Sequence, residues 1–258
     1  MKVSGHTTPA TPEGNRLSHA FRAPFHHADP TGRVGIVPLA NYLQQAAGEH
    51  AERLGLGAER LMQEGLFWVL TRIYLNIERA PRAGQSLTVE TWPSRPPRQL
   101  FQRDFQIRSE DAGLLITATS SWALIDAATR KAVRGPAWIA GRVAYEAVRA
   151  VEFPVHRPTR LNSPELSFDI VPRRSELDLN GHVNNASLMG WLFEVLDDAW
   201  LNEHGLAALD IVFRSECTRE HAVHSWAVRL GDNHFQHALR RDNGVEIARA
   251  KSWWRRGA

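Results

Sequence analysis

The chain has 258 residues, of which 43% are hydrophobic and 23% are charged, a composition typical of a globular protein with material for a large core. Its formal net charge is only +3 and it has no long basic run, which argues against a nucleic-acid partner. No apolar run reaches the length of a membrane span. The single cysteine, Cys217, excludes an intramolecular disulfide and argues against a cysteine-based zinc site. We therefore expect a cytoplasmic protein without metal or cofactor.

Residues 1–16 are rich in proline, threonine and glycine and lack the apolar stretch of a secretory signal. We expect them to form a mobile tail. A first domain is expected over residues 17–140. Its polar turn at Asp29 leads into a predicted helix, whose apolar residues recur at the spacing of one buried helix face. These apolar residues are Leu39, Tyr42, Leu43, Ala46 and Ala47.

Four β-rich runs follow this helix, and turn signals separate them. The runs span residues 67–80, 85–95, 100–109 and 114–126. A long helix followed by an antiparallel meander makes an α+β unit in which a curved sheet wraps the helix. Residues 141–164 contain three prolines and show no clean period, so we expect a linker there. A second domain is expected over residues 165–258.

The second domain repeats the turn and the helix of the first at a constant offset of 149 residues. The matched turn positions are Asp29 with Asp178, Gly32 with Gly181, and Val34 with Val183. The matched apolar helix positions of the second domain are Leu188, Trp191, Leu192, Val195 and Leu196. A later echo pairs Gly113–Trp122 with Gly244–Trp253. Two echoes in the same order indicate an internal duplication, and they predict a second long helix wrapped by a second sheet.

Three polar side chains, Asp178, Asn180 and His182, stand at alternate positions just before the second predicted helix. They could cap that helix, or they could form a reaction site beside its unpaired N–H groups. The first domain keeps the aspartate but has Thr31 and Arg33 where the second has the amide and the imidazole. Shared residues are therefore expected to be structural, which makes Asp178 the weakest catalytic candidate of the three. We predict one active site per chain, in the second domain.

Three motifs of the second domain resemble those of the acyl-acyl carrier protein thioesterases of plants and bacteria. LDLNGHVNNASLMGWLFE (177–194) is similar to their Asn-x-His-Val-Asn-Asn motif, VFRSECTRE (212–220) to their Arg-x-Glu-Cys motif, and ARAKSWWR (248–255) to their closing strand. The first-domain run WVLTRIYLNIERAPRAGQSLTVETWPS is also similar to this family. One position departs from the pattern, because Gly181 stands where the family often has glutamine before the histidine.

This resemblance implies a tandem hotdog fold, an α+β architecture in which two long helices are each wrapped by antiparallel sheet about a pseudo-twofold within one chain. It also implies hydrolysis of the thioester between a fatty acyl chain and acyl carrier protein, with release of free fatty acid. Acyl carrier protein would be an acidic partner that presents the acyl group on phosphopantetheine. The residues that match the catalytic motifs are Asp178, Asn180, His182 and Glu216, with Cys217 as an alternative nucleophile.

Hydrolysis of a thioester needs a stabilised oxyanion. A helix N-terminus offers unpaired N–H groups and a partial positive charge. Donors at Asn180, Val183 and Asn184 lie where they could converge on a carbonyl oxygen, and losing one such donor typically costs on the order of 10²–10³ in rate. Capping is the alternative role for the asparagine at position 184.

The same reaction needs an activated water. His182 and Glu216 are both candidates for the base. On a regular strand Glu216 and Cys217 point to opposite faces, so at most one of them should enter the site. We assign the base to Glu216 and expect Cys217 to be a small buried hydrophobe. A thiolate nucleophile activated by His182 is the rival interpretation.

Aromatic residues of the first domain, Trp68, Trp92 and Phe101, are expected to line an apolar groove for the acyl chain, since each buried methylene contributes about 0.8 kcal/mol. Arg95 and Arg98 could meet the acidic carrier protein or the phosphopantetheine phosphate, or could belong to a solvated face. The first domain would then bind the acyl tail while the second carries the chemistry.

Two other functions fit the same pattern. The chain could be an acyl-CoA thioesterase on the same fold, or a non-catalytic hotdog protein that binds acyl thioesters without turnover. Activity on acyl-acyl carrier protein against acyl-CoA would separate the first alternative, and binding without hydrolysis would identify the second. A homodimer is possible, although the two halves could also satisfy each other as a pseudo-dimer within one chain.

Overall fold

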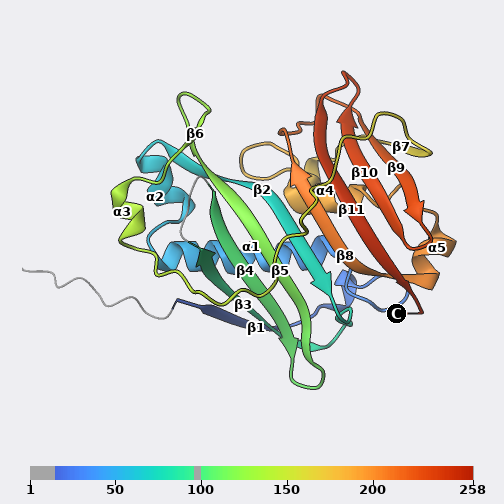
Figure 1. The fold of residues 1–258 in the computed structure, drawn as a ribbon, viewed down its shortest axis with the longest axis horizontal. Coiled ribbons are helices and arrows are strands. Elements are labelled where there is room, and N and C mark those ends of the chain that lie inside the picture. Colours follow the sequence, from blue (N-terminus) through green and yellow to red (C-terminus); the bar gives the residue numbers. More distant parts are fainter. Residues whose placement is uncertain (1–14, 96–99, 258) are drawn as a thin grey trace, which may run out of the picture.

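The computed structural model describes residues 15–95 and 100–257. The expected tail lies outside these residues, apart from Asn15 and Arg16. In the described part of the chain, eleven strands form one antiparallel sheet, and the helices α1 and α4 lie on the same side of it (Figure 1). One hydrophobic core joins both helices to the sheet.

The strand order is symmetric about the middle of the sheet. From the outer edge inward, the first half contributes β1 (Leu17–Arg22), β3 (Ser86–Arg95), β4 (Phe101–Ser109), β5 (Gly113–Asp126) and β2 (Leu66–Ile77). From the middle outward, the second half contributes β8 (His204–Phe213), β11 (Glu246–Arg256), β10 (His234–Arg241), β9 (Val223–Gly231) and β7 (Leu166–Ile170). A short strand, β6 (Ala132–Val133), pairs with β5. The corresponding strands of the two halves therefore occupy corresponding places, in agreement with the duplication read from the sequence.

The two halves meet where β2 pairs with β8. A buried ion pair lies at this seam, with Arg72 Nη2 2.7 Å from Asp210 Oδ2. Arg72 also donates to the carbonyl oxygen of Pro154. Burial raises the pKa of Asp210, and the Arg72 guanidinium opposes that rise. Because removing one partner would leave a buried charge uncompensated, the pair ties the two halves together in one register.

Helix α1 (Ile36–Arg53) follows the first polar turn and forms the long helix predicted there. Its buried residues are Leu39, Ala40, Leu43, Ala46, Ala47 and His50, and Tyr42 is partly buried against the same core. The predicted apolar face is thus confirmed. Small residues on this face let the helix lie close to the sheet, where it contacts β1 and β3.

The second helix is much shorter than predicted. Helix α4 ends at Trp191 after starting at Asn185, and the chain continues in turns to α5 (Asp198–Glu203). Three-residue turns replace the helical bonds here, with Phe193 N–H donating to Gly190 and Leu196 N–H donating to Phe193. Most of the predicted apolar positions are still buried, because a succession of such turns keeps nearly the same apolar spacing as a helix. The prediction of two long helices is therefore wrong for the second half.

Beyond Tyr145, the segment 141–164 crosses from the first half to the second along the sheet face that points away from α1 (Figure 1). It is pinned by the buried carboxylate of Asp104, which accepts bonds from Arg149 Nε at 2.7 Å and from Ala150 N at 2.8 Å. The ring nitrogen of Trp92 donates to the carbonyl of Val148. The remaining short elements are η1 (Phe25–His27), α2 (Ala58–Gln63), α3 (Ala137–Ala140) and η2 (Arg174–Glu176). None of the helices in the described residues combines the length and apolar character needed to cross a bilayer.

Candidate active site

A tight turn carries the predicted catalytic motif into α4. One carboxylate oxygen of Asp178 accepts the backbone N–H groups of Asn180 at 2.8 Å and of His182 at 3.0 Å. The Asp178 N–H donates to the carbonyl of His182 at 2.7 Å, which closes the turn. Gly181 has a φ of 76°, a left-handed conformation that glycine adopts without steric cost. The departure from the family pattern at this position therefore suits the turn.

The first half contains the same turn built on Asp29. Its Oδ1 accepts the N–H groups of Thr31 at 2.8 Å and of Arg33 at 3.2 Å, and Gly32 has a φ of 80°. The two aspartates thus hold equivalent backbone atoms in both halves. This equivalence supports a structural role for Asp178, since its carboxylate is engaged by the turn itself.

The structure brings His182 and Glu216 together. His182 Nε2 lies 3.4 Å from Glu216 Oε2, and the two side chains are 26% and 43% exposed. A backbone hydrogen bond holds these two side chains close together. The Val183 N–H donates to Cys217 O at 2.7 Å and so joins the turn to the segment after β8. The other carboxylate oxygen of Glu216 accepts a bond from Arg130 Nη2 at 2.5 Å. A carboxylate, an imidazole and a guanidinium therefore meet at a place that solvent can reach.

Glu216 and Cys217 lie beyond the end of β8 at Phe213, in an irregular segment rather than on the strand expected for them. They still face opposite environments. The Cys217 side chain is buried, and its Sγ lies 3.6 Å from the carbonyl oxygen of Thr218. Burial raises the pKa of the Cys217 thiol, which disfavours the thiolate that a nucleophile requires. The geometry supports Cys217 as a buried hydrophobe over Cys217 as a nucleophile.

Two of the expected oxyanion donors are occupied, which corrects the prediction for their backbone amides. The N–H of Val183 is bonded to Cys217, and the N–H of Asn184 donates to Glu176 O at 2.8 Å. The Asn184 side chain caps α4 by accepting from Ala186 N at 2.8 Å. These two bonds fix the start of α4 against Cys217 and Glu176, so neither backbone amide is left to donate to a substrate oxygen.

Asn180 lies in the same turn as His182 and is exposed. Its backbone N–H is bonded to Asp178, whereas no residue in the described part of the chain is hydrogen-bonded to its side-chain amide. That amide can therefore donate to an incoming carbonyl oxygen. Of the predicted oxyanion donors, Asn180 is the one that the geometry leaves available.

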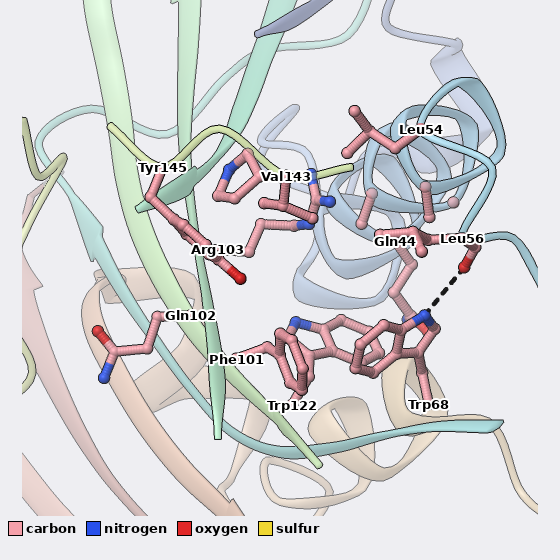
Figure 2. A pocket seen from close by; sticks show the side chains of 14 residues that line it. Gln44, Leu54, Leu56, Trp68, Phe101, Gln102, Arg103, Trp122, Val143 and Tyr145 are labelled. Carbon is pink, nitrogen blue, oxygen red and sulfur yellow. Dashed lines mark hydrogen bonds between the residues drawn. The ribbon is translucent and has the colours of Figure 1, made fainter. Parts of the chain in front are cut away.

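A cavity of about 180 Å³ opens in the first half between α1 and the sheet. Figure 2 shows the aromatic rings of Phe101, Trp122 and Trp68 along one side of it. The Trp68 and Phe101 ring centroids are 4.8 Å apart, and the Trp68 ring nitrogen donates to Leu56 O at 3.0 Å (Figure 2). The apolar wall is completed by Ala47, Ala51, Leu54, Leu56 and Val143. The size and the lining suit an acyl chain.

This cavity also contains polar groups. Arg103 donates from Nη1 to His50 Nδ1 at 2.9 Å and to Thr91 Oγ1 at 3.1 Å, and burial lowers the pKa of Arg103 to about 10. Gln44 lies on the wall nearest the second half, and its side chain donates to Asn184 Oδ1 at 3.3 Å. The cavity wall is thus in direct contact with the residue that caps α4.

The other residues predicted to bind substrate lie elsewhere. Trp92 is fully buried on the opposite face of β3, where the linker covers it, so the prediction that it lines the cavity is wrong. Strand alternation explains the error, because the neighbouring residue Pro93 is the one on β3 that lines the cavity. Arg95 forms an exposed ion pair with Glu152 at 2.6 Å. Arg98 lies outside the described residues.

Sequence reasoning missed Trp122 and Arg130. Trp122 lies directly opposite Phe101 in the β4–β5 register, so pairing the two runs as a hairpin could have found it. Arg130 lies in the β5–β6 turn and reaches the second half. No sequence pattern indicates that contact, because it depends on how the two halves of the sheet join at β2 and β8.

Two helices against one continuous antiparallel sheet, with corresponding strands in corresponding places, define a pair of hotdog domains in a single chain. The chain belongs to the acyl-ACP thioesterase family. Sequence models of that family match it twice, as the N-terminal domain over residues 14–139 and as the C-terminal domain over residues 162–256. The resemblance noted in the motifs is thus confirmed.

Individual relatives agree. The chain is 30% identical over 251 residues to a chloroplastic palmitoyl-acyl carrier protein thioesterase of Gossypium hirsutum, an alignment that covers 88% of this chain and 60% of that protein. It is 26% identical to a chloroplastic dodecanoyl-[acyl-carrier-protein] hydrolase of Cinnamomum camphora, covering 95% of this chain and 69% of that protein. The matched part of the chain thus spans only 60% and 69% of the length of these two relatives.

Solved structures confirm the tandem hotdog fold. A 12:0-ACP thioesterase from Umbellularia californica superposes with a TM-score of 0.85 at 25% identity, covering 95% of this chain and 98% of that one. An acyl-ACP thioesterase from Bacteroides thetaiotaomicron gives the same TM-score at 23% identity, covering 93% and 98% of the two chains.

Proposed function

We propose that this chain hydrolyses the thioester of fatty acyl-acyl carrier protein and releases free fatty acid. The observation that carries the proposal is the 3.4 Å approach of His182 Nε2 to Glu216 Oε2, beside a turn that also presents Asn180. Membership of the acyl-ACP thioesterase family supports it, as do the names of the relatives. The expected catalytic set, Asp178, Asn180, His182 and Glu216, is kept in this proposal with distinct roles.

Glu216 is the proposed base. It accepts a proton from a water molecule while the water oxygen attacks the carbonyl carbon of the thioester. The carbonyl oxygen becomes an oxyanion, which the side-chain amide of Asn180 stabilises by donating to it. His182, held beside Glu216, orients the attacking water. The oxyanion then collapses, the C–S bond breaks, and the sulfur leaves with the proton as a thiol. Asp178 holds the turn that positions Asn180 and His182.

The acyl chain is proposed to occupy the cavity of the first half. Its aromatic and aliphatic lining would gain about 0.8 kcal/mol for each methylene removed from water. Under this proposal residues 17–140 form the acyl-binding domain and residues 165–258 the catalytic domain, joined by the linker 141–164. The contact between Gln44 and Asn184 supports a substrate path from the cavity towards the catalytic turn.

The carrier is the finer part of the proposal. Acyl carrier protein is favoured over coenzyme A because the relatives are named for acyl carrier protein substrates. Hydrolysis of matched acyl-acyl carrier protein and acyl-CoA substrates of equal chain length tests this preference. A kcat/KM at least about tenfold higher for the carrier protein substrate is expected, which corresponds to about 1.4 kcal/mol of transition-state stabilisation. Equal values would leave an acyl-CoA thioesterase as the better description.

The assignment of the base can be tested with two neighbouring residues. Glu216→Gln removes the proton acceptor but keeps the shape of the side chain, and we expect kcat to fall on the order of 10²–10⁴-fold. Cys217→Ala removes the thiol, and we expect most of the activity to remain because the sulfur is buried away from the site. Thermal melting of both variants controls for folding. Activity that survives Glu216→Gln but not Cys217→Ala would make the cysteine the nucleophile.

Location and assembly remain predictions. The relatives are named as chloroplastic proteins, whereas the lone buried cysteine supports the cytoplasm, which is also a reducing compartment, for this chain. A homodimer is a further prediction, and sedimentation of the purified chain at several concentrations tests it.

A further inference from the structure

The carboxylate of Glu216 is held from both halves of the molecule. His182, from the second half, faces one of its oxygens at 3.4 Å. Arg130, from the first half, donates to the other at 2.5 Å. The arginine and glutamate side chains are 56% and 43% exposed, and exposed ion pairs of this kind contribute only about 0–1 kcal/mol to stability. The contact therefore has little value for folding, and its effect lies in the orientation of the carboxylate.

The turn between β5 and β6 is built to present Arg130. Among the described residues, Arg130 is the one non-glycine with a positive φ, at 58°. For a side-chain-bearing residue this conformation costs roughly 1–2 kcal/mol, so it persists where the surroundings impose it. They do so here, because Asp126 Oδ1 accepts both the N–H and the hydroxyl of Thr129 at 2.7 Å. Asp126 O accepts the Arg130 N–H at 2.9 Å.

The guanidinium also has an aromatic support. Its central carbon lies 5.2 Å from the centroid of the Phe67 ring on β2, within the range of a cation–π contact. Phe67 adjoins Trp68, which lines the acyl cavity. The turn, the ring and the carboxylate together restrict where the arginine can point.

We propose that Arg130 is a positioning residue, through which the acyl-binding half orients the catalytic carboxylate of the other half. By holding one oxygen of Glu216, the guanidinium orients the second oxygen towards His182 and towards the attacking water of the proposed reaction. This inference rests on the proposed function, because it gives Arg130 a role only through Glu216. It differs from the prediction that the second half alone carries the active site, since under this proposal Arg130 of the first half is also needed.

A double-mutant cycle tests the proposal. Steady-state kcat and KM are measured with one acyl-acyl carrier protein that carries a saturated fatty acyl chain. The enzymes compared are the wild type, Arg130→Gln, Glu216→Gln and the double variant. Arg130→Gln should lower kcat on the order of 10- to 100-fold, the effect of misplacing a catalytic group by about 1 Å, and should leave KM within about twofold. In the Glu216→Gln background the same substitution should have no further effect, because the group it positions is already gone.

Two further variants separate positioning from charge and from folding. Arg130→Lys keeps a cation that can donate to Glu216 but loses the planar, two-nitrogen geometry of the guanidinium, so kcat should be higher than in Arg130→Gln but lower than in the wild type. Arg60→Gln is the matched control, because Arg60 also pairs with an exposed glutamate, Glu64, at 2.7 Å and also lies over an indole ring, that of Trp138. It should leave kcat unchanged. No Arg130 variant should change the melting temperature by more than Arg60→Gln does.

Each other outcome overturns a distinct claim. If Arg130→Gln raises KM with kcat unchanged, and does so equally in the Glu216→Gln background, the arginine binds the substrate and does not position Glu216. If the wild type and Glu216→Gln behave as expected while Arg130→Gln equals the wild type, only the role of Arg130 is lost. If the wild type does not hydrolyse the thioester, the proposed function fails and the positioning role falls with it.

Discussion

Asp178 is the residue whose role the internal duplication can decide. Its carboxylate accepts two backbone N–H groups of its own turn, as Asp29 does in the first half. Replacing either aspartate by alanine should lower the stability of the protein by about 1 kcal/mol, the effect of losing such a side-chain acceptor. Only Asp178→Ala should also lower kcat, because its turn carries Asn180 and His182. Chemical denaturation and steady-state kinetics of the two variants measure both effects.

The asparagine variant separates structure from chemistry at position 178. Asp178→Asn keeps an oxygen that can accept the two N–H groups but removes the negative charge. A structural role predicts that most of the activity survives this change. Loss of activity in Asp178→Asn at unchanged stability would instead give the carboxylate a direct part in catalysis, against the role assigned to it here.

At the residue scale the sequence was most informative where the two copies differ. The polar residues present only in the second copy, Asn180 and His182, lie in the candidate site, whereas the shared aspartate holds a turn in both halves. Hydrogen bonds of the backbone could not be foreseen in the same way. Val183 and Asn184 stand at a helix start, but their amides are taken by Cys217 and Glu176, which are close only in the folded chain.

At the element scale, the two helices show what apolar periodicity can predict. The spacing of apolar residues predicted the buried face of α1 correctly from Leu39 to Ala47, but it did not include the buried His50 in the last turn. The same spacing in the second half continues through turns beyond Trp191, because those turns advance the chain by about three residues each. A new cap at Asp197, whose side chain accepts the Trp200 N–H at 2.7 Å, then starts α5. Periodicity therefore located the buried side chains of both halves but not the end of the second helix.

His50, in the last turn of α1, makes the free energy of unfolding of the protein depend on pH. It is buried in the last turn of the helix, where burial, together with Arg103 and Arg53, lowers the pKa of the imidazole from 6.5 to about 4. Above pH 6.5 the imidazole is neutral in both folded and unfolded chains. Between that pH and about 4 the unfolded chain takes up a proton that the folded protein does not. The free energy of unfolding should therefore fall on acidification, by up to about 1.4 kcal/mol per pH unit from this group.

Urea denaturation at about pH 7 and at about pH 5 measures this loss. In His50→Gln a side-chain oxygen can still accept from Arg103, but no titrating group remains, so the loss on acidification should be smaller. His237 on β10, whose burial lowers its pKa to about 3, contributes a slope of the same sign in both proteins. An equal loss in the variant and the wild type would show that His50 does not resist protonation.

At the scale of the whole molecule, the duplication predicted two similar units but not how they join. Nothing in either repeat indicates that β2 and β8 become neighbours, because each strand has an open edge in its own unit. The seam brings Arg72 to Asp210 and lets the β5–β6 turn reach Glu216. The seam is thus the source of the Arg130–Glu216 contact that the sequence did not indicate, and it links the half proposed to bind the acyl chain to the half proposed to carry the catalytic groups.

The proposed separation of acyl binding from chemistry leads to a last prediction, about chain length. Ala51 lies on α1 and lines the cavity proposed to hold the acyl chain, so Ala51→Leu should fill part of its roughly 180 Å³. Excluding one methylene of substrate costs about 0.8 kcal/mol, which lowers kcat/KM about fourfold. The loss should grow with acyl length, so that the preferred chain becomes shorter. The kcat for the shortest good substrate should be retained, because the proposed catalytic groups of Asn180, His182 and Glu216 lie in the second half.

A panel of acyl-acyl carrier proteins of increasing chain length measures the shift. Ala58→Leu on α2 is the matched control, because it adds the same side chain at an exposed position and should leave the profile unchanged. A uniform fall across all chain lengths in Ala51→Leu would mean that the cavity does not measure the acyl chain. A shift in preference with the maximal rate preserved would instead show that this cavity measures the acyl chain and that the measurement is separate from the chemical step.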